Sequence, residues 1–439
     1  MSDPSTWGFE TRQIHAGQSP DSATGARALP IYQTTAYAFR DTEHAANLFA
    51  LKEFGNIYTR IMNPTQDAVE QRIAALEGGV GALLVASGQS ATTLGLLNIA
   101  EAGDHIVASA ALYGGTFNLL KYTFAKLGVQ VTFVEDQNNP DAWRAAATPQ
   151  TKAFFGETIA NPKAEILDIR AVADVAHELG IPLVVDNTIA TPFLLRPIEH
   201  GADVVLHSAT KYLGGHGTSI AGVIVDAGSF DYTVNPERFP NYNTPDESYH
   251  GLQYGPHLGV GSPFGANLSY ILKARVQLLR DLGPAISPFN AFLLAQGIET
   301  LSLRIERHIE NTRKVADFLQ GHDQVESVRW ASIPGNPGKE LADRYTPKGS
   351  GAVLSFEIAG GRDAGKAFVE GLSLHSHVAN IGDVRSLAIH PASTTHSQGG
   401  DEDRLAAGVT PGLIRLAVGL ESIDDILADL EAGFAAAQA

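Results

Sequence analysis

Lys211 gives this chain of 439 residues its clearest chemical signal. It follows the apolar run 204–206 and lies beside the hydroxyl groups of Ser208 and Thr210. A run of this kind predicts a strand buried on both faces, and open α/β sheets bind their ligands where such strands end. We therefore expect Lys211 to lie at the mouth of a binding site.

Asp186 closes an earlier apolar run, residues 183–185, in the same way. If the two runs form neighbouring strands, its carboxylate and the amine of Lys211 meet in one crevice. These groups suit pyridoxal phosphate. The amine forms a Schiff base with the aldehyde, the hydroxyls of Ser208 and Thr210 help to hold the phosphate, and the carboxylate keeps the pyridine nitrogen protonated. From these residues alone, a solvated loop lysine and a strand-end cap are the alternative.

Three further turns supply candidate ligands. Gly88 and Gln89 open a predicted helix, whose free backbone N–H groups can hold a phosphate. Tyr113 lies on a glycine-rich turn, well placed to cover a planar ring. Asn161 precedes a proline and offers an amide to a ligand. Each also has a simpler interpretation: an empty strand-to-helix turn, a core tyrosine and an ordinary Asn-Pro turn.

Tyr58, Arg60 and Arg415 are the remaining polar candidates. Tyr58 and Arg60 are two residues apart, so in an extended segment they point the same way and fit a phosphate together. A surface pair without function is the alternative. Arg415 interrupts an apolar strand pattern, where burial without a partner would be costly. It is expected to meet a carboxylate, either from the protein or from a substrate.

The middle of the chain predicts an α/β fold. Strand-like runs alternate with helical segments, which indicates a mostly parallel sheet covered by helices. One such helix begins after the N-cap Asp168 and ends at Gly180. The aromatic and glycine-rich stretch 227–266 breaks this rhythm and is interpreted as an insertion. The strand-like runs are 105–108, 129–134, 153–155, 183–185, 204–206 and 221–225.

The two ends of the chain have other patterns. Residues 1–63 contain many turn formers and predict an extended arm that embraces a partner. Residues 64–284 then form the sheet domain. Residues 285–439 predict a smaller α+β domain, with a long helical region at 289–319 and strands at 351–358, 374–381 and 412–420.

The composition excludes several classes of function. A net charge of −17 without any Lys/Arg cluster argues against nucleic-acid binding. No apolar stretch reaches the roughly 20 residues that span a bilayer, and the first residues lack a signal pattern, so we expect a cytoplasmic protein without membrane contact. With no cysteine, disulfides and cysteine nucleophiles are excluded. The histidines lack metal-ligand spacing, so no metal site is expected.

Seven segments resemble the Cys/Met-metabolism family of pyridoxal-phosphate enzymes in order and spacing, over nearly the whole chain. The resemblance implies fold type I, with an N-terminal arm, a large cofactor domain and a smaller C-terminal domain. It also implies a homotetramer built from dimers that share active sites. The segments are 87–89, 112–116, 161–162, 184–188, 208–212, 390–393 and 412–416.

The same resemblance implies a role for each candidate residue. Lys211 would carry the cofactor and move protons, and Asp186 would pair with the pyridine nitrogen. Tyr113 would stack on the ring, and Asn161 would contact a cofactor oxygen. Arg415 would bind the α-carboxylate of an amino-acid substrate. The phosphate ligands would be Gly88, Gln89, Ser208, Thr210 and, from the neighbouring subunit, Tyr58 and Arg60.

Within the family, the insertion at 227–266 and the run 380–386 look like those of O-acetylhomoserine sulfhydrylases. Cystathionine-handling relatives commonly carry an acidic residue where this chain has Arg385. Such a carboxylate would suit the ammonium group of a bulky amino-acid partner, so its absence favours a small thiol such as sulfide. Whether Arg385 faces the site is left open. The absence of cysteine counts against the methionine γ-lyase branch.

The implied reaction is a γ-replacement in methionine biosynthesis, in which O-acetyl-L-homoserine and sulfide give L-homocysteine and acetate. Lys211 would remove the α-proton, and Tyr113 would assist proton movement near the leaving group. Asn380 and Tyr58 are expected to contact the substrate together with Arg415. A cystathionine γ-synthase or methionine γ-lyase activity on the same fold is the alternative.

Overall fold

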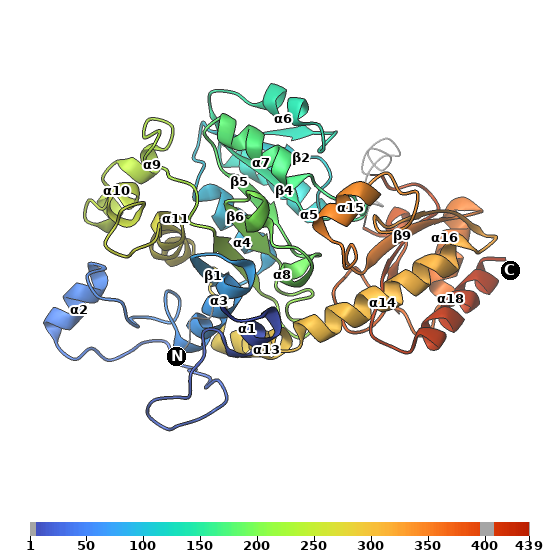
Figure 1. Cartoon of the computed structure of the whole chain (residues 1–439), viewed down its shortest axis with the longest axis horizontal. Helices are drawn as coiled ribbons and strands as arrows, with labels where there is room; N and C mark the ends of the chain where they lie inside the picture. The colour runs from blue at the N-terminus through green and yellow to red at the C-terminus, as the bar shows by residue number, and fades with distance from the viewer. Residues whose placement is uncertain (1–5, 396–407, 439) are drawn as a thin grey trace.

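The computed structural model describes residues 6–395 and 408–438. A central domain built on a large sheet lies between the C-terminal domain on one side and the helices α2, α9 and α10 on the other (Figure 1). Among the helices described, none is long and apolar enough to cross a membrane.

The large sheet has the strand order β1-β7-β6-β5-β4-β2-β3 within the described residues. Neighbouring strands are parallel except at β7, which is antiparallel to both β1 and β6. The predicted α/β fold is confirmed, and the valine-rich runs of β5 and β6 are buried, as a sheet covered on both faces requires. The strands are β1 (Gly81–Val85), β2 (His105–Ser109), β3 (Gln130–Val134), β4 (Thr151–Glu157), β5 (Leu183–Asp186), β6 (Val204–His207) and β7 (Gly222–Asp226).

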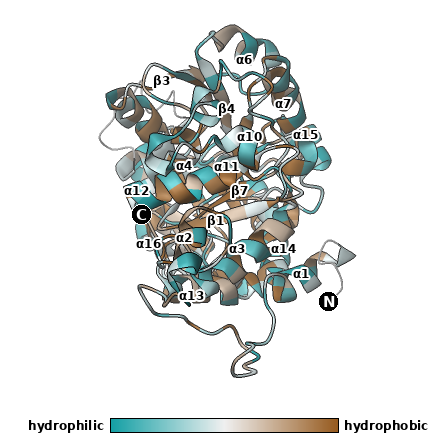
Figure 2. Ribbon diagram, turned by 90° about the vertical axis from the view of Figure 1, so that its left-hand side faces the viewer, coloured by the Kyte–Doolittle hydropathy of each residue, from teal (hydrophilic) through white to brown (hydrophobic). Residues whose placement is uncertain are grey.

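Helices surround this sheet, and the hydropathy of their residues can be followed in Figure 2. As predicted, the carboxylate of Asp168 caps α7 by accepting the N–H of Ala171. Ser87 caps α4 in the same way, through the N–H of Ser90. The helices are α3 (Pro64–Glu77), α4 (Gly88–Leu97), α5 (Gly114–Asn118), η2 (Leu119–Phe124), α6 (Pro140–Ala146), α7 (Ile169–Glu178), α8 (Thr191–Leu194) and η3 (Pro197–His200).

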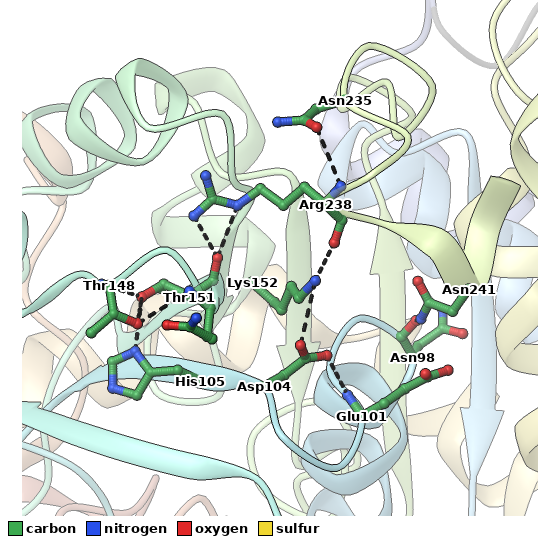
Figure 3. A network of polar contacts seen from close by, with 11 residues as sticks. Asn98, Glu101, Asp104, His105, Thr148, Thr151, Lys152, Asn235, Arg238 and Asn241 are labelled. Carbon is green, nitrogen blue, oxygen red and sulfur yellow. Dashed lines mark hydrogen bonds and ion pairs between the residues drawn. The ribbon is translucent and has the colours of Figure 1, made fainter.

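The insertion that follows β7 is anchored to the sheet by Arg238 (Figure 3). The guanidinium donates to the carbonyl oxygen of Thr151 at 2.6 and 3.0 Å. In return, Lys152 donates to the carbonyl oxygen of Arg238 and pairs with Asp104 at 3.4 Å. The insertion is therefore packed against the sheet. Its helices, and those that follow, are α9 (Pro240–Asn243), η4 (Glu247–Tyr249), α10 (Tyr254–Leu258), α11 (Ser269–Lys273), η5 (Ala274–Leu279) and α12 (Arg280–Leu282).

The N-terminal arm contains two short helices that the sequence pattern did not predict, α1 (Phe9–His15) and α2 (Thr42–Phe49). The first is fixed to the body of the protein, because the amide of Gln13 donates to the hydroxyl of Ser302 at 2.9 Å. The second lies far from the central sheet (Figure 1).

The C-terminal domain contains a second sheet, with the order β10-β11-β12-β9-β8 in the part of the chain that is described. The predicted helical region 289–319 is divided into α13 and α14, and at the division the carbonyl oxygen of Gly297 accepts a hydrogen bond from Arg304 at 2.7 Å. Of the predicted strand 374–381, only residues 376–377 form a strand, and residues 379–381 line the cavity that is described in the next subsection. The elements are α13 (Pro288–Ile298), α14 (Leu301–Gln320), β8 (Val325–Arg329), α15 (Lys339–Tyr345), β9 (Val353–Ile358), α16 (Gly361–Gly371), β10 (Ser376–His377), β11 (Leu387–Ile389), η6 (Pro391–Ser393), β12 (Leu413–Ala417) and α18 (Ile423–Gln438).

A buried acid at the end of β7 makes the stability of the fold depend on pH. Burial raises the pKa of Asp226 from its ordinary value of 3.8 to about 7. Because the folded state then holds the proton more tightly than the unfolded chain, this contribution to stability is fully present below about pH 4 and is lost as the pH rises to 7.

We expect Asp226→Asn to remove part of this pH dependence, since the amide does not titrate but can still accept the Gly228 N–H at 2.8 Å. From pH 5 to 7.5, the wild type should lose about 1–3 kcal/mol more unfolding free energy than the variant. Urea unfolding at both pH values measures this difference. Equal losses in the two proteins would contradict the assignment.

Candidate active site

A cavity of about 280 Å³ opens where β4, β5 and β6 end. Its wall includes segments from both domains, which lie far apart in the sequence. Because the carboxyl ends of parallel strands meet at one edge of a sheet, the polar groups that follow these strands converge here. The predicted site residues that line it are Gly88, Gln89, Tyr113, Asn161, Asp186, Ser208, Thr210, Lys211, Asn380 and Arg415.

One end of the cavity is shaped for a small anion. It lies at the N-terminus of α4, where backbone N–H groups and the helix dipole favour negative charge. A Cβ atom added to Gly88 would lie only 2.6 Å from the Cβ of Ser208 and 2.8 Å from its hydroxyl oxygen. Only glycine therefore allows this helix to approach the loop that follows β6.

The hydroxyl of Thr210 is partly engaged within the protein. It accepts the N–H of Ala221 at 3.0 Å and donates to the carbonyl oxygen of the same residue at 3.2 Å. To donate to a phosphate, this hydroxyl would have to give up the carbonyl of Ala221. Its contact with Ala221 also ties the Lys211 loop to the start of β7.

Two carboxyl groups lie side by side at the ends of β4 and β5. Asp186 is paired with Glu157 in the register of the two strands, and burial raises the pKa of both. Hydrogen bonds from Thr188, including its backbone N–H at 2.9 Å, oppose the rise in the pKa of Asp186. The negative charge of Asp186 adds to the rise in the pKa of Glu157. Simultaneous ionisation of the two carboxyl groups is therefore disfavoured, and a cationic ring nitrogen beside them would stabilise their negative charge.

Glu157 was missed in the sequence because the strand was expected to end at Phe155. Its side chain accepts the backbone N–H of Tyr113 at 2.6 Å, so it fixes the turn that carries this tyrosine. The signal that identified Asp186, an acid closing an apolar run, would also have found Glu157.

Lys211 points into the cavity from the loop after β6. Its amine donates to the side-chain oxygen of Asn380 at 2.5 Å. Burial lowers the pKa of Lys211, and the positive charge of Arg415 lowers it further. The amine therefore loses its proton more easily than a lysine in solvent, as a base or nucleophile requires.

Arg415 reaches the same cavity from β12. The guanidinium donates to the carbonyl oxygen of Asn380 at 2.9 Å and to the side-chain oxygen of Asn161 at 3.5 Å. Its buried Nε has no hydrogen-bond partner, and burial lowers its pKa to about 10. Of the two partners expected for it, a protein carboxylate is not found within ion-pair distance among the described residues. The group is thus available for a carboxylate that enters the cavity.

Tyr113 lies at the mouth of the cavity, with about half of its surface exposed. Its ring passes over Gly115, where a Cβ atom would lie 2.4 Å from the ring and 3.0 Å from the amide of Gln89. The glycine thus allows the ring to lie beside Gln89, over the anion end of the cavity.

Tyr58 and Arg60 do not line this cavity. They contact each other instead, with the guanidinium 5.0 Å from the centre of the tyrosine ring. Arg385 does not line it either, because its exposed side chain pairs with Asp383 at 3.1 Å. A single chain thus brings together every predicted ligand except this pair from the arm.

Comparison with known proteins places these residues in context. Residues 10–435 match the Cys/Met metabolism PLP-dependent enzyme family. An O-acetyl-L-homoserine sulfhydrylase of Leptospira meyeri is 58% identical over 424 residues, which cover 96% of this chain and 95% of the relative. An O-acetyl-L-homoserine sulfhydrylase of Corynebacterium glutamicum is 54% identical over 438 residues, which cover 99% and 98%.

A solved structure from Campylobacter jejuni shares the fold, with a TM-score of 0.93 and 38% identity over 98% of this chain and 100% of that chain. That protein, assigned as an O-acetylhomoserine (thiol)-lyase, contains N'-pyridoxyl-lysine-5'-monophosphate. The cavity described above fits this cofactor. The anion end suits its phosphate, the acid pair suits its ring nitrogen, and Lys211 is the lysine that lines the cavity.

Gly88→Ala should weaken cofactor binding by about tenfold or more, because the new methyl group overlaps Ser208 and must displace the loop that carries Lys211. Titrating the apoprotein with pyridoxal phosphate, followed by visible absorbance, measures the dissociation constant. Gly321→Ala is the matched control, since a Cβ there lies no closer than 3.7 Å to its neighbours. Wild-type affinity in Gly88→Ala would show that the cradle is not where the phosphate binds.

Proposed function

As this chain belongs to the Cys/Met metabolism PLP-dependent enzymes, we propose that it converts O-acetyl-L-homoserine and sulfide into L-homocysteine and acetate, a step of methionine biosynthesis. The observation that carries this proposal is the set of groups around one cavity: the amine of Lys211, the carboxyl group of Asp186 and the guanidinium of Arg415, which has no protein carboxylate as a partner among the described residues. The two bacterial relatives named above are sulfhydrylases of this ester.

The residues of the cavity divide the work among them. Bound pyridoxal phosphate withdraws electrons from the α-carbon of the amino acid and so makes the α-proton acidic. Asp186 holds the ring nitrogen in its protonated form. Arg415 binds the α-carboxylate by two parallel hydrogen bonds, which orients the α-carbon towards Lys211. The lysine, whose pKa burial lowers, then takes the proton.

Loss of acetate from the γ-carbon requires further proton transfers. Lys211 and Tyr113 face the cavity from opposite elements, the loop after β6 and the turn before α5. We assign the proton at the β-carbon to Lys211 and assistance at the leaving group to Tyr113. Asn380, which accepts the amine of Lys211, keeps that amine beside the substrate.

The choice of sulfide as the nucleophile follows the two bacterial relatives named above. The position of Arg385 does not decide it, because this side chain is largely exposed, pairs with Asp383 and does not line the cavity.

We also propose that the enzyme is a homotetramer built from dimers that share active sites. Tyr58 and Arg60 contact each other but do not reach the cavity of their own chain. Tyr58 is 39% exposed, and the Nε of Arg60 is buried without a hydrogen-bond partner. Both side chains would serve as phosphate ligands in a neighbouring subunit, where Tyr58 would also contact the substrate. A cytoplasmic location stays a prediction from the sequence.

The purified protein should form homocysteine from O-acetyl-L-homoserine only when sulfide is present. Lys211→Ala should abolish turnover, because the base is lost, while its circular dichroism spectrum stays unchanged. A product assay specific for homocysteine, run with and without sulfide, measures turnover by the wild type and by Lys211→Ala. Ammonia and 2-oxobutyrate released without sulfide would mean a γ-lyase, and product formed with cysteine in place of sulfide would mean a cystathionine synthase.

Subunit complementation tests the shared site. Arg60→Ala and Lys211→Ala homo-oligomers should each be inactive, but a mixed dimer would rebuild one site with both residues intact. Random reassembly of equal amounts should then restore about a quarter of wild-type activity. Reassembled Lys211→Ala alone is the control. If the mixture stays inactive although mixed oligomers form, Arg60 does not act across subunits.

A further inference from the structure

Glu77 is a fully buried carboxylate to which the chemistry above assigns no role. It ends helix α3, and its side chain has no exposed surface. One oxygen, Oε1, accepts two hydrogen bonds, from the amide of Asn187 at 2.9 Å and from Nε2 of His207 at 2.6 Å. The other oxygen, Oε2, has no hydrogen-bond partner. A carboxylate buried in this way is costly, so a purely structural role would be served better by an apolar side chain.

The two donors lie at the ends of different strands, next in sequence to residues that line the cavity. Asn187 follows Asp186 at the end of β5. His207 is the last residue of β6 and precedes Ser208, in the loop that carries Lys211. A single oxygen of Glu77 therefore joins the ends of the two strands at the edge where the cavity opens.

Asn187 is held rigidly enough to transmit this connection. Its amide also donates to the carbonyl oxygen of Leu195 at 2.9 Å, and its oxygen accepts the hydroxyl of Thr158 at 3.0 Å. Its backbone N–H donates to the carbonyl oxygen of Leu206 at 2.8 Å. Every polar group of the Asn187 side chain is thus engaged, so these hydrogen bonds fix its orientation.

His207 also lies close to Asp186, because it directly follows Leu206, the register partner of Asp186 on β6. Burial and the neighbouring Glu157 disfavour a second negative charge in this part of the protein, whereas Thr188 and His207 lower the pKa of Asp186. The hydrogen bond to Glu77 fixes the imidazole of His207 in its position near Asp186, and the effect on the pKa of Asp186 depends on that position.

We infer that Glu77 is a positioning residue, which through Asn187 and His207 holds the ends of β5 and β6 in the register that lets Asp186 and Lys211 face one cavity. This inference rests on the proposed function only for the identity of the bound cofactor. It concerns how the protein positions the residues that bind the cofactor, and it can be tested without any substrate.

The chain offers a matched control at the opposite ends of the same two strands. Asp203, just before β6, is also buried, and its carboxylate accepts a hydrogen bond from Nε2 of His177 at 2.8 Å. It further accepts the backbone N–H of Leu183, at the start of β5, at 2.9 Å. Glu77 and Asp203 therefore make similar connections between β5 and β6, but only Glu77 makes them beside the cavity.

The experiment compares Glu77→Ala with Asp203→Ala. Thermal unfolding temperatures should fall in both. The dissociation constant for pyridoxal phosphate, from absorbance titration of the apoprotein without substrate, should rise about tenfold or more only in Glu77→Ala. The visible absorbance band of the bound cofactor should also shift only in this variant. Glu77→Gln keeps an acceptor oxygen and should recover most of the affinity.

Two results would overturn the inference: unchanged cofactor affinity in Glu77→Ala, or an equal loss of affinity in Asp203→Ala. If Glu77→Ala does not fold, His207→Ala breaks the same connection from the side of β6 and is subject to the same comparison. Because cofactor binding is measured in the absence of ester and sulfide, a failure of the sulfhydrylase assay leaves this test intact.

Discussion

Four ionisable side chains are kept out of water around one cavity, and much of the structure serves to make this possible. Lys211 and Arg415 would repel each other there, as would Asp186 and Glu157. Burial lowers the pKa of the two bases and raises the pKa of the two acids, which favours the neutral form of each group. The strand ends and helix α4 supply fixed dipoles in place of water. A ligand with a phosphate, a ring cation and a carboxylate has the charges that this arrangement leaves unmatched.

Local patterns in the sequence were enough to predict the central sheet and most of the cavity. Asp186 and Lys211 each follow a short valine-rich run. Such runs are typical of strands that are buried on both faces of a parallel sheet. The turn at Gly88 could be recognised because it combines a cap, a glycine and a helix start. Arg415 and Asn161 could also be recognised locally as candidates, but only the resemblance to a family indicated a specific role for each.

Features that depend on distant pairing could not be read from the sequence. The pairing of Glu157 with Asp186 depends on the register of β4 with β5. The availability of Arg415 depends on the absence of a carboxylate partner in the described surroundings of β12. The guanidinium of Arg304 reaches the Gly297 carbonyl at the break between α13 and α14, a contact that local periodicity does not indicate. The positions of Tyr58 and Arg60 relative to a cavity depend on a second subunit, so the isolated chain leaves them apart from the other ligands.

The placement of β7 between β1 and β6 affects how the chain folds during its synthesis on the ribosome. Chains emerge N-terminus first, yet β1 pairs in the described sheet only with β7, which is made much later. Until β7 emerges, β1 and the helix that begins at Gly88 have no strand joining them to β6 and the loop of Lys211. The nascent chain therefore passes through a long interval in which its cofactor pocket does not exist, so the cofactor cannot guide the early steps of folding.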